Sequence, residues 1–427
     1  IQVDRRTEFG DLFDEAWGRL KEGFYDPKMH GVDWDAMKKR YRPMAVEAEI
    51  KGEFHNVINQ MLAELGASHL GIRGGEETPT TVRPKRQNSG HLGLELEPEP
   101  HEDGGYRIAH ILPGGPADEL GLRVGDVVTR LNRKRKRART NIDTILTNAQ
   151  DKELSITFRP ATADGLGTER RRSITAASWR SLAMRNYGNW AKKNADYVKK
   201  ETKGKAGYIH LDMMMPPQLN RFRQAVQTWN RSKKIKAMVL DVRFNGGGNI
   251  HVPLMQVLTS KPLMKFKPRS GREMLQPELY WDKPVVVLIN ERSFSDAEVF
   301  PDAFRTANIG KLVGVPTAGG VIGTNDIELS DGSTLRIPRV GYYSMDGTRL
   351  EGQGVQPDVL VIETPEDRRL GRDPQLAKAV EDIHGDVAAR AKKPATAKPT
   401  EKPTEKPEGK PTPETPGTPT TPGGASA

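Results

Sequence analysis

A buried strand, a serine-bearing turn and the start of a helix follow one another in PVVVLINERSFSDAE, residues 284–298. An uninterrupted apolar run such as its first six positions is typical of a strand that is covered on both faces of a sheet. Three similar runs begin at Ala206, Lys236 and Gly310. Helical patterns lie between them, at residues 218–229 and 297–307. This alternation predicts a parallel-rich α/β layer with helices on both faces, in which reactive groups gather at the carboxyl ends of the strands.

The first part of the chain, residues 1–72, is predicted to be a small helical domain. Large apolar residues recur there at spacings of three and four, as they do along the buried stripe of a helix. They include Phe9, Phe13, Trp17, Leu20 and Phe24. The polar stretch that follows, residues 73–87, has the Gly, Thr and Pro content of an exposed linker.

Short strands separated by turn residues replace the helical pattern over residues 88–162. Here PGGPADELGLRVGDVVTRLN, residues 113–132, resembles the core signature of the PDZ family, in which a short helix precedes a Gly-Leu-x-x-Gly-Asp turn and a strand. By the same resemblance, His91, Leu92, Gly93 and Leu94 form the loop whose backbone N–H groups hold the terminal carboxylate of a peptide. A module that only packs against its neighbours is the alternative, and the sequence leaves both interpretations open.

The fold class predicted for the whole chain is multidomain and combines α+β with α/β parts. The α/β layer is predicted within residues 163–388, and its pattern of strands and helices resembles that of a crotonase-like or Clp-protease-like catalytic domain. From residue 389 to residue 427 the chain consists largely of Lys, Pro, Thr, Glu, Ala and Gly. Such a segment cannot bury enough apolar surface to offset the entropy lost on ordering, so we expect a disordered C-terminal tail.

The composition limits the chemistry. The 427 residues include no cysteine, which excludes disulfides, thiolate metal sites and a thiol nucleophile. No HExxH motif is present, so a zinc hydrolase is not favoured and no cofactor is expected. The net charge is +10, and six cations lie between Arg133 and Arg139. A solvated loop is the simpler interpretation of that run, and association with nucleic acid is the alternative.

The location of the protein is less constrained than its chemistry. No apolar run approaches the roughly 18 residues that cross a bilayer, so no membrane span is expected. The chain begins with Ile1 rather than Met, which we interpret as a processed product or a piece of a longer protein. The absence of cysteine suits a reducing cytoplasm, the location taken as a hypothesis, although exported proteins can also lack cysteine.

Ser295 and His69 are the residues that could carry a reaction, and each has a structural alternative. Ser295 forms a capping box with Glu298, yet a serine at a strand-to-helix turn also presents its hydroxyl beside free backbone N–H groups. Its activation requires a base. Among nine histidines, only His69, in GASHLG, has a flanking pattern that suggests reactivity, and its alternative is a cation at a helix C-terminus.

Five motifs in order connect these residues with a known family: ELGASHLGI, DVRFNGGGN, NERSFSDAE, GVPTAGG and EGQGVQPD. Together with the order of the domains, they resemble the catalytic half of tricorn core proteases over residues 9–383. These proteases are relatives of the carboxy-terminal processing peptidases. The resemblance implies a serine peptidase in which Ser295 is the nucleophile and His69 the general base. It further implies that Ser68 and Glu351 assist the base, in a Glu–Ser–His–Ser relay.

The resemblance also implies an oxyanion hole made of backbone N–H groups. They are those of Gly248 and Asp296, with Gly247 as the neighbouring option. In the processing peptidases, a lysine after the nucleophile serves as base. The matching segment here, GVPTAGGVIG, contains no lysine, which favours the histidine-based chemistry.

Expectations about substrates and partners come from the same resemblance. Members that prefer basic residues place an acid in the specificity pocket, whereas KPLMKFKPRSG, from Lys261, has none and has Phe266 near that position, so an apolar preference is predicted. Tricorn chains assemble as hexamers and also contain β-propeller domains that are missing here, so a homo-hexamer with such partners is implied. The predicted function is a serine endopeptidase that cleaves peptides or unfolded segments. The alternative is a non-catalytic PDZ-type peptide-binding protein.

Overall fold

The computed structural model describes residues 4–75, 88–102, 104–132, 134–135, 142–269, 271 and 273–392. Its contacts divide the chain into a large unit, residues 1–387, and a small unit, residues 388–427. Most of the predicted linker, most of the basic run and nearly all of the predicted tail lie outside the described residues. Although a tail is predicted from residue 389, the last helix, α11 (Pro374–Lys392), continues to Lys392.

Three helices form the N-terminal part of the chain, as the apolar spacing predicts. They are α1 (Arg5–Gly23), α2 (Trp34–Val46) and α3 (Lys51–Ala63), with a 3₁₀ turn, η1 (Met29–Gly31), between the first two. Asp4 and Asp33 cap α1 and α2, because each carboxylate accepts a backbone N–H of the first turn. The apolar stripes of the helices face one another, and the rings of Phe9 and Phe54 stack in the centre.

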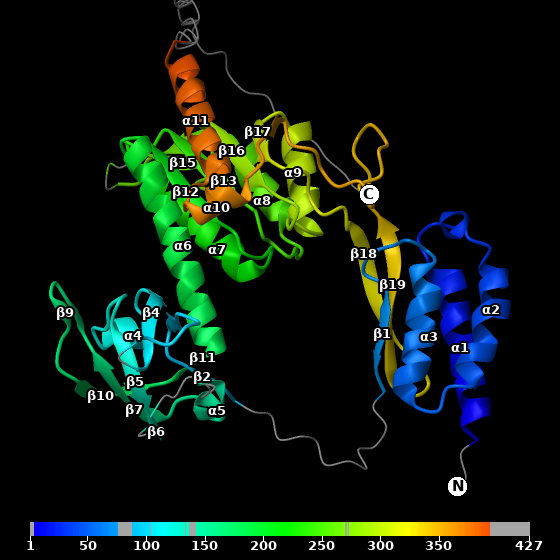
Figure 1. Ribbon diagram of the computed structural model, residues 1–427. Helices are drawn as coiled ribbons and strands as arrows, with labels where there is room; N and C mark the ends of the chain where they lie inside the picture. The colour runs from blue at the N-terminus through cyan, green and yellow to red at the C-terminus, as the bar shows by residue number, and fades with distance from the viewer. Residues whose placement is uncertain are drawn as a thin grey trace, which may run out of the picture. The chain divides into compact units, whose positions relative to one another are not determined.

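A β-hairpin from late in the chain completes the core of this helical part. β1 (Gly71–Gly74) pairs with β19 (Ser333–Gly341), which in turn pairs with β18 (Ile322–Glu328), and all three run antiparallel (Figure 1). Leu335 and Ile337 of β19 are fully buried in the apolar cluster formed by the helices. This hairpin lies within the 163–388 domain predicted from the sequence, whereas the structure packs it against the first helices of the chain.

The PDZ-like part is an antiparallel sheet with two short helices. Its strand order is β10-β7-β5-β4-β3, and β6 also pairs with β5. The elements are β3 (Leu94–Leu96), β4 (Tyr106–Ile111), α4 (Pro116–Glu119), β5 (Val127–Leu131), β6 (Lys134–Arg135), α5 (Ile142–Leu146), β7 (Glu153–Arg159) and β10 (Arg170–Thr175). Two small pairs adjoin them, β2 (Gly90–His91) with β11 (Ala177–Ser178) and β8 (Ala161–Thr162) with β9 (Gly165–Leu166). Because β3 ends the strand order, one of its edges has no partner strand among the described residues.

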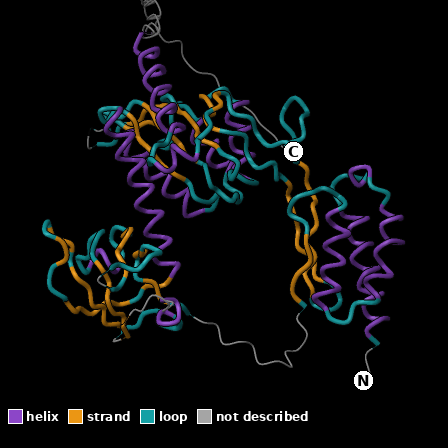
Figure 2. The backbone as a smooth tube through the Cα atoms, viewed as in Figure 1, coloured by secondary structure: helices purple, strands orange, loops and turns teal. Residues whose placement is uncertain are grey.

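Five parallel strands form the central sheet of the α/β layer. In spatial order they are β12 (Ala206–His210), β13 (Ala237–Asp241), β16 (Val285–Ile289), β17 (Gly310–Gly314) and β20 (Val359–Leu360). Figure 2 shows these strands in orange among purple helices. Outside the sheet lie a strand pair, β14 (Met264–Phe266) with β15 (Met274–Gln276), and a short helix, α10 (Pro365–Arg369).

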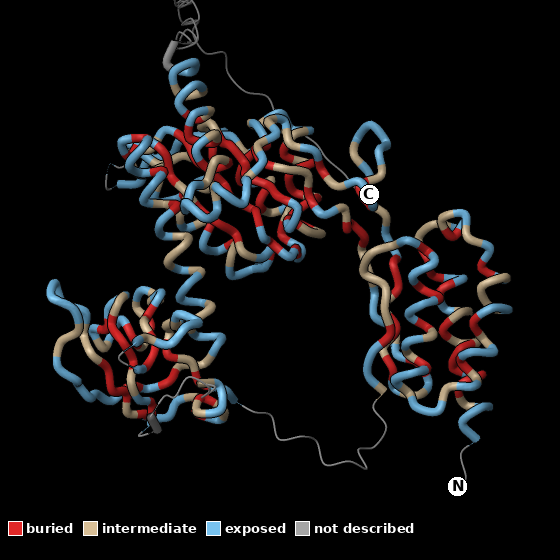
Figure 3. The backbone as a smooth tube through the Cα atoms, viewed as in Figure 1, coloured by how far each residue is buried: buried red, intermediate tan, exposed pale blue. Residues whose placement is uncertain are grey.

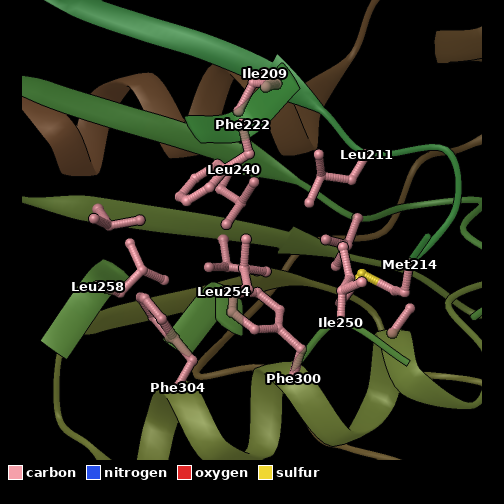
Figure 4. Packing of buried hydrophobic residues seen from close by; sticks show 14 of the residues in the cluster. Ile209, Leu211, Met214, Phe222, Leu240, Ile250, Leu254, Leu258, Phe300 and Phe304 are labelled. Carbon is pink, nitrogen blue, oxygen red and sulfur yellow. The ribbon is translucent and has the colours of Figure 1, made fainter. Parts of the chain in front are cut away.

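Successive side chains of the central strands enter two different apolar clusters. Met238 and Leu240 face α7 (Pro216–Arg231), α8 (His251–Thr259) and α9 (Asp296–Thr306). Ala237 and Val239 lie on the other face, against α6 (Trp179–Glu201) and α11. Figure 3 shows buried segments running through this layer, and Figure 4 shows Leu240 with Phe222, Leu254 and Phe300 on one face of it. The predicted parallel layer with helices on both faces is therefore confirmed.

Candidate active site

The carboxyl ends of two neighbouring strands bring the glycine loop and the serine turn together. β13 and β16 pair in parallel, with Asp241 opposite Leu288, so the segments that follow them emerge at the same edge of the sheet. The buried side chain of Asn290 joins these segments. Its oxygen accepts the backbone N–H of Phe244 at 2.9 Å and that of Arg292 at 3.2 Å. The two loops are thus held against each other by a satisfied buried amide.

Ser295 stands immediately before α9 in the left-handed backbone conformation, with φ +58°. A non-glycine residue in this region costs on the order of 1–3 kcal/mol and persists only where its surroundings enforce it. The fully buried Glu298 does so, because its carboxylate accepts the Ser295 N–H at 3.0 Å. The same carboxylate accepts the Thr317 hydroxyl and the N–H groups of Gly319 and Gly320. The Glu298 half of the capping box that the sequence predicts therefore fixes the backbone that presents the serine.

Gly247 and Gly248 differ in what their N–H groups do. The Gly247 N–H donates to the side-chain oxygen of Asn245 at 2.8 Å, so it is already used within the loop. The N–H groups of Gly248 and of Asp296, the first residue of α9, have no hydrogen-bond acceptor among the described residues. Gly247 is needed for space instead, since a Cβ there would lie 2.6 Å from the Cβ of Ser295. Of the predicted donors, Gly248 and Asp296 are the two that are free.

The Asp296 side chain joins the start of α9 to the start of α8. Its Oδ2 accepts the backbone N–H of Ile250 at 2.7 Å and that of His251 at 3.1 Å, and its Oδ1 accepts a hydrogen bond from His251 Nδ1. The donors follow Gly248 by two and three positions, so the carboxylate fixes the Gly248 N–H relative to the Asp296 N–H. His251 has no role predicted from the sequence, because residue spacing does not reveal a contact between the starts of two helices.

Glu351, Ser68 and His69 form a continuous chain of hydrogen bonds. Glu351 is 2% exposed, and its two oxygens accept the Ser68 N–H at 2.6 Å and the Ser68 hydroxyl at 3.0 Å. The Ser68 oxygen lies 2.7 Å from His69 Nδ1. Because a carboxylate can only accept hydrogen bonds, the Ser68 hydroxyl donates to Glu351. The Ser68 oxygen in turn accepts a hydrogen bond from Nδ1–H of His69. His69 then has its lone pair on Nε2, the form that can take a proton.

The surroundings of His69 keep the imidazole neutral. Its ring stacks on Phe294, with centroids 4.7 Å apart and planes at 14°. Burial lowers the pKa of His69, and the positive charge of Arg336 lowers that pKa further, whereas Glu351 raises it. A neutral imidazole at pH 7 is free to accept a proton. Like Ser295, His69 has a positive φ, +61°, a strained conformation that is frequent at functional sites.

A cavity of about 400 Å³ collects most of the predicted site residues. Its lining includes His69, Gly247, Gly248, Ser295 and Asp296. Ser68 and Glu351 stand behind the imidazole and do not line it. No direct hydrogen bond joins the Ser295 hydroxyl to His69 in the described part of the chain. Phe266, predicted to lie near the specificity pocket, is absent from the described lining and lies 40% exposed in β14.

The predicted peptide-binding loop of the PDZ-like part lines a separate cavity. Residues 91–94 form part of its wall, and its volume is about 740 Å³. The groove also contains Leu146 of α5 and Trp179 of α6, whose side chain is 69% exposed. The open edge of β3 therefore faces a groove with an apolar side.

No group of three or more His, Asp or Glu side chains is placed to hold a metal ion in the ranges that the structure describes. Nor does any described helix have both the length and the apolar character needed to cross a membrane.

Three parts of the chain match known family models. Residues 5–63 match the tricorn protease C1 domain, residues 81–158 the PDZ domain and residues 205–361 peptidase family S41. Tricorn protease homolog 1 of Streptomyces coelicolor is 28% identical over 410 residues, which cover 93% of this chain and 37% of that protein. Tricorn protease of Thermoplasma acidophilum is 27% identical over 401 residues, which cover 90% and 36%.

A solved structure also resembles this chain. The crystal structure of the tricorn protease matches with a TM-score of 0.71 at 25% identity, covering 90% of this chain and 37% of that one. The chain spans little more than a third of the length of these relatives.

Proposed function

We propose that the chain is a tricorn-type serine peptidase of family S41, an endopeptidase that works through a relay of Glu351, Ser68, His69 and Ser295. One observation carries the proposal. A hydrogen-bonded chain runs from the buried Glu351 through Ser68 to His69, and the imidazole shares a cavity with Ser295. A carboxylate, a bridging hydroxyl and an imidazole in that order match an orienting group, its link and a general base.

Acylation is the first half of the reaction in this proposal. The Ser295 oxygen attacks the carbonyl carbon of the scissile bond while Nε2 of His69 takes the hydroxyl proton. Negative charge develops on the carbonyl oxygen, which accepts hydrogen bonds from the N–H groups of Gly248 and Asp296. In comparable sites each such donor stabilises the transition state by about 3 kcal/mol. His69 then gives its proton to the nitrogen of the leaving amine, which departs and leaves an acyl ester on Ser295.

Deacylation repeats these steps with water. His69 takes a proton from a water molecule that attacks the ester, and then returns a proton to the Ser295 oxygen. In both halves the imidazole is transiently positive. The negative charge of Glu351 stabilises that form through the hydroxyl of Ser68. The Ser68 oxygen accepts a hydrogen bond from Nδ1–H throughout.

Extended peptides and unfolded segments are the proposed substrates. A cavity of about 400 Å³ admits a few side chains of an extended chain but no folded domain. Apolar side chains form part of its walls, among them Met213, Val299, Val321 and Tyr342. These walls support the predicted apolar preference, which the position of Phe266 does not.

Labelling with a fluorophosphonate probe tests the proposal. The wild-type protein should be labelled, and labelling should be lost in Ser295→Ala and strongly reduced in His69→Ala. Ser330→Ala, which changes an exposed serine remote from the cavity, is the matched control and should be labelled like the wild type. A wild-type protein that is folded but neither labelled nor able to cleave denatured casein would contradict the proposal. The remaining reading would then be a peptide-binding protein that uses the groove of about 740 Å³.

The family resemblance extends the proposal to partners and location. A ring of six copies is proposed, and light scattering should give six times the mass of the chain. β-Propeller domains are the proposed companions of this chain, since its relatives are more than twice as long. The cytoplasm is the proposed location, which cell fractionation tests. A monomeric mass would remove the ring and leave the chemistry of the site unaffected.

A further inference from the structure

Strand pairing places Arg336 beside His69. β1 begins two residues after His69, and Gly71 of β1 lies directly opposite Arg336 of β19. Gly71 leaves this position open, since a Cβ there would have only the side chain of Asn59 within 4 Å. Arg336 and His69 both line the cavity that contains Ser295. The guanidinium therefore reaches the same space as the imidazole, from the side formed by β1 and β19.

The guanidinium of Arg336 is fixed at one nitrogen and free at the other two. Its Nε donates to the hydroxyl of Thr324 at 2.8 Å. Asp326, its partner across the strand pair, forms an ion pair with Nε at 3.9 Å, beyond hydrogen-bond distance, and shares its carboxylate with Arg73. Neither terminal nitrogen of Arg336 has an acceptor within the described ranges. A fork of N–H donors with an incompletely balanced charge is therefore available to the cavity.

Little else in the cavity offsets this charge. Among the described residues that line it, Asp296 is the only carboxylate, and Asp296 is already occupied by the N–H groups of Ile250 and His251. The effect of Arg336 on the pKa of His69 is a second sign that the guanidinium lies close to the imidazole. An anion that enters this part of the cavity meets a favourable potential.

The chemistry of the proposed reaction decides which side of the substrate meets Arg336. An imidazole that takes the proton of Ser295 and passes it to the leaving amine must lie on the leaving-group side of the scissile bond. The oxyanion donors, Gly248 and Asp296, come from other loops. Arg336 stands across from the strand that continues from His69, so it meets the residues that follow the scissile bond.

We propose that Arg336 binds a carboxylate that the substrate carries just after the scissile bond. The carboxylate is an Asp or Glu side chain, or the chain terminus of a short leaving peptide. Both match the planar fork of an arginine, which binds a carboxylate through two parallel hydrogen bonds. This inference rests on the proposed peptidase function and specifies its substrates as acidic on the leaving-group side.

Cleavage profiling followed by defined peptides tests the inference. The full chain is first given a mixture of peptides from a denatured proteome, and mass spectrometry identifies the cleaved bonds. One cleaved peptide is then synthesised with Asp, Asn or Lys directly after the bond, each with a free or an amidated C-terminus. Asp should exceed Asn in kcat/KM by about 10-fold, and Lys should be cleaved most slowly. The Asp-to-Asn ratio should fall as salt is added, because the pair is partly exposed.

Variants of Arg336 test the residue itself. In Arg336→Gln the Asp-to-Asn ratio should approach 1, and in Arg336→Lys it should lie in between, because a lysine keeps the charge without the fork. Arg339→Gln, at an exposed position on the same strand that does not line the cavity, is the matched control and should keep the wild-type ratio. Thermal melts of each variant establish that the hairpin is intact.

The outcomes separate this inference from the proposed function. A preference that follows the side chain identifies an acidic residue, one that disappears on amidation identifies a chain terminus, and both support a carboxylate site. A wild-type enzyme that cleaves Asp and Asn peptides equally well, and free and amidated peptides equally well, would overturn the inference and leave the peptidase standing. A ratio that persists in Arg336→Gln would also overturn it. A wild type that cleaves nothing and takes no fluorophosphonate overturns both.

Discussion

Glu351 accepts both the backbone N–H and the hydroxyl of Ser68, although 283 positions separate the two residues. Ser68 follows the last of the first three helices, and Glu351 follows the hairpin β18–β19, which packs on those same helices. The hairpin thus carries the chain from the α/β layer to the helices and back to the layer. His69 is oriented only when both parts have folded, because its Nδ1 partner is held by Glu351.

Interrupting the relay should slow the reaction without unfolding the protein. Glu351→Gln keeps the size of the side chain but turns one acceptor into a donor, while Ser68 N–H, Ser68 O–H and Val321 N–H all donate to it. We expect kcat/KM to fall about 100-fold, with a larger loss in His69→Ala, by analogy with other serine relays. Steady-state kinetics and circular dichroism measure the two effects. Wild-type kcat/KM in Glu351→Gln would show that the carboxylate has no part in the reaction.

The pH dependence of activity should shift in opposite directions in two variants. Because burial and Arg336 lower the pKa of His69, the acid limb of kcat/KM should lie below the ordinary histidine value of 6.5. Arg336→Gln removes a positive neighbour, so the pKa of His69 rises and the limb moves to higher pH. Glu351→Gln removes a negative neighbour, so the limb moves to lower pH. Profiles from pH 4 to 9 check both, and shifts of the same sign would mean that the limb reports another group.

The fold could be read from the sequence wherever local pattern and burial agree. The continuous apolar runs at 236–242 and 284–289 are covered on both faces, and those two runs became β13 and β16. The hairpin that contains Leu335 could not be assigned in the same way, since its alternation is that of any half-buried strand pair. Nothing in its spacing says that its apolar face is covered by helices from the start of the chain.

The site residues also differ in whether a local sequence pattern could predict them. Ser295 and Glu298 lie three positions apart, so the turn that presents the serine is visible as a local motif. His69 was a candidate base from its flanking residues, but its pairing with Ser295 and the role of Glu351 came only from resemblance, because residue spacing does not reveal contacts between distant segments. His251 and Arg336 were missed, since each acts through a partner on another element, Asp296 in one case and the strand of Gly71 in the other.

His251 should matter for the rate of acylation rather than for substrate binding. Its Nδ1 donates to Asp296, whose own N–H is a proposed oxyanion donor, so loss of the imidazole loosens the relation between the two donors. We expect His251→Ala to lower kcat about 10-fold with KM nearly unchanged, and His251→Asn to restore part of the loss, because its amide can donate to the same carboxylate. Equal losses in both variants, or an effect on KM alone, would contradict a positioning role.

Gly248 should tolerate no side chain. A Cβ at this position would lie 1.9 Å from the carbonyl oxygen of Met214, so the backbone that carries the free N–H must move. Gly248→Ala should therefore lose at least 100-fold in kcat, as removal of one oxyanion donor does elsewhere. Gly246→Ala is the comparison in the same loop, because a Cβ there would be 3.4 Å from a flexible methionine side chain. It should lose much less, and an equal loss in the two would mean that the loop responds to any side chain.

Glu298→Gln should destabilise the fold, although burial alone argues the opposite. Burial raises the pKa of Glu298, which means that the charged form costs stability as pH rises through that pKa, and removing the charge would by itself help at neutral pH. Four donors face the two oxygens, however, namely the N–H groups of Ser295, Gly319 and Gly320 and the hydroxyl of Thr317. A glutamine amide must point its NH₂ at two of them.

The hydrogen bonds should prevail over the charge. Leaving two buried donors without an acceptor costs about 1–3 kcal/mol each. Neutralising a carboxylate that already accepts four hydrogen bonds recovers less free energy than that. We expect the free energy of unfolding of Glu298→Gln to fall by about 2 kcal/mol or more, measured by urea titration at pH 7. Glu366→Gln, at an exposed glutamate paired with Arg369, is the matched control and should leave stability unchanged within error. A more stable Glu298→Gln would mean that desolvation outweighs the hydrogen bonds and that Ser295 keeps its strained backbone without them.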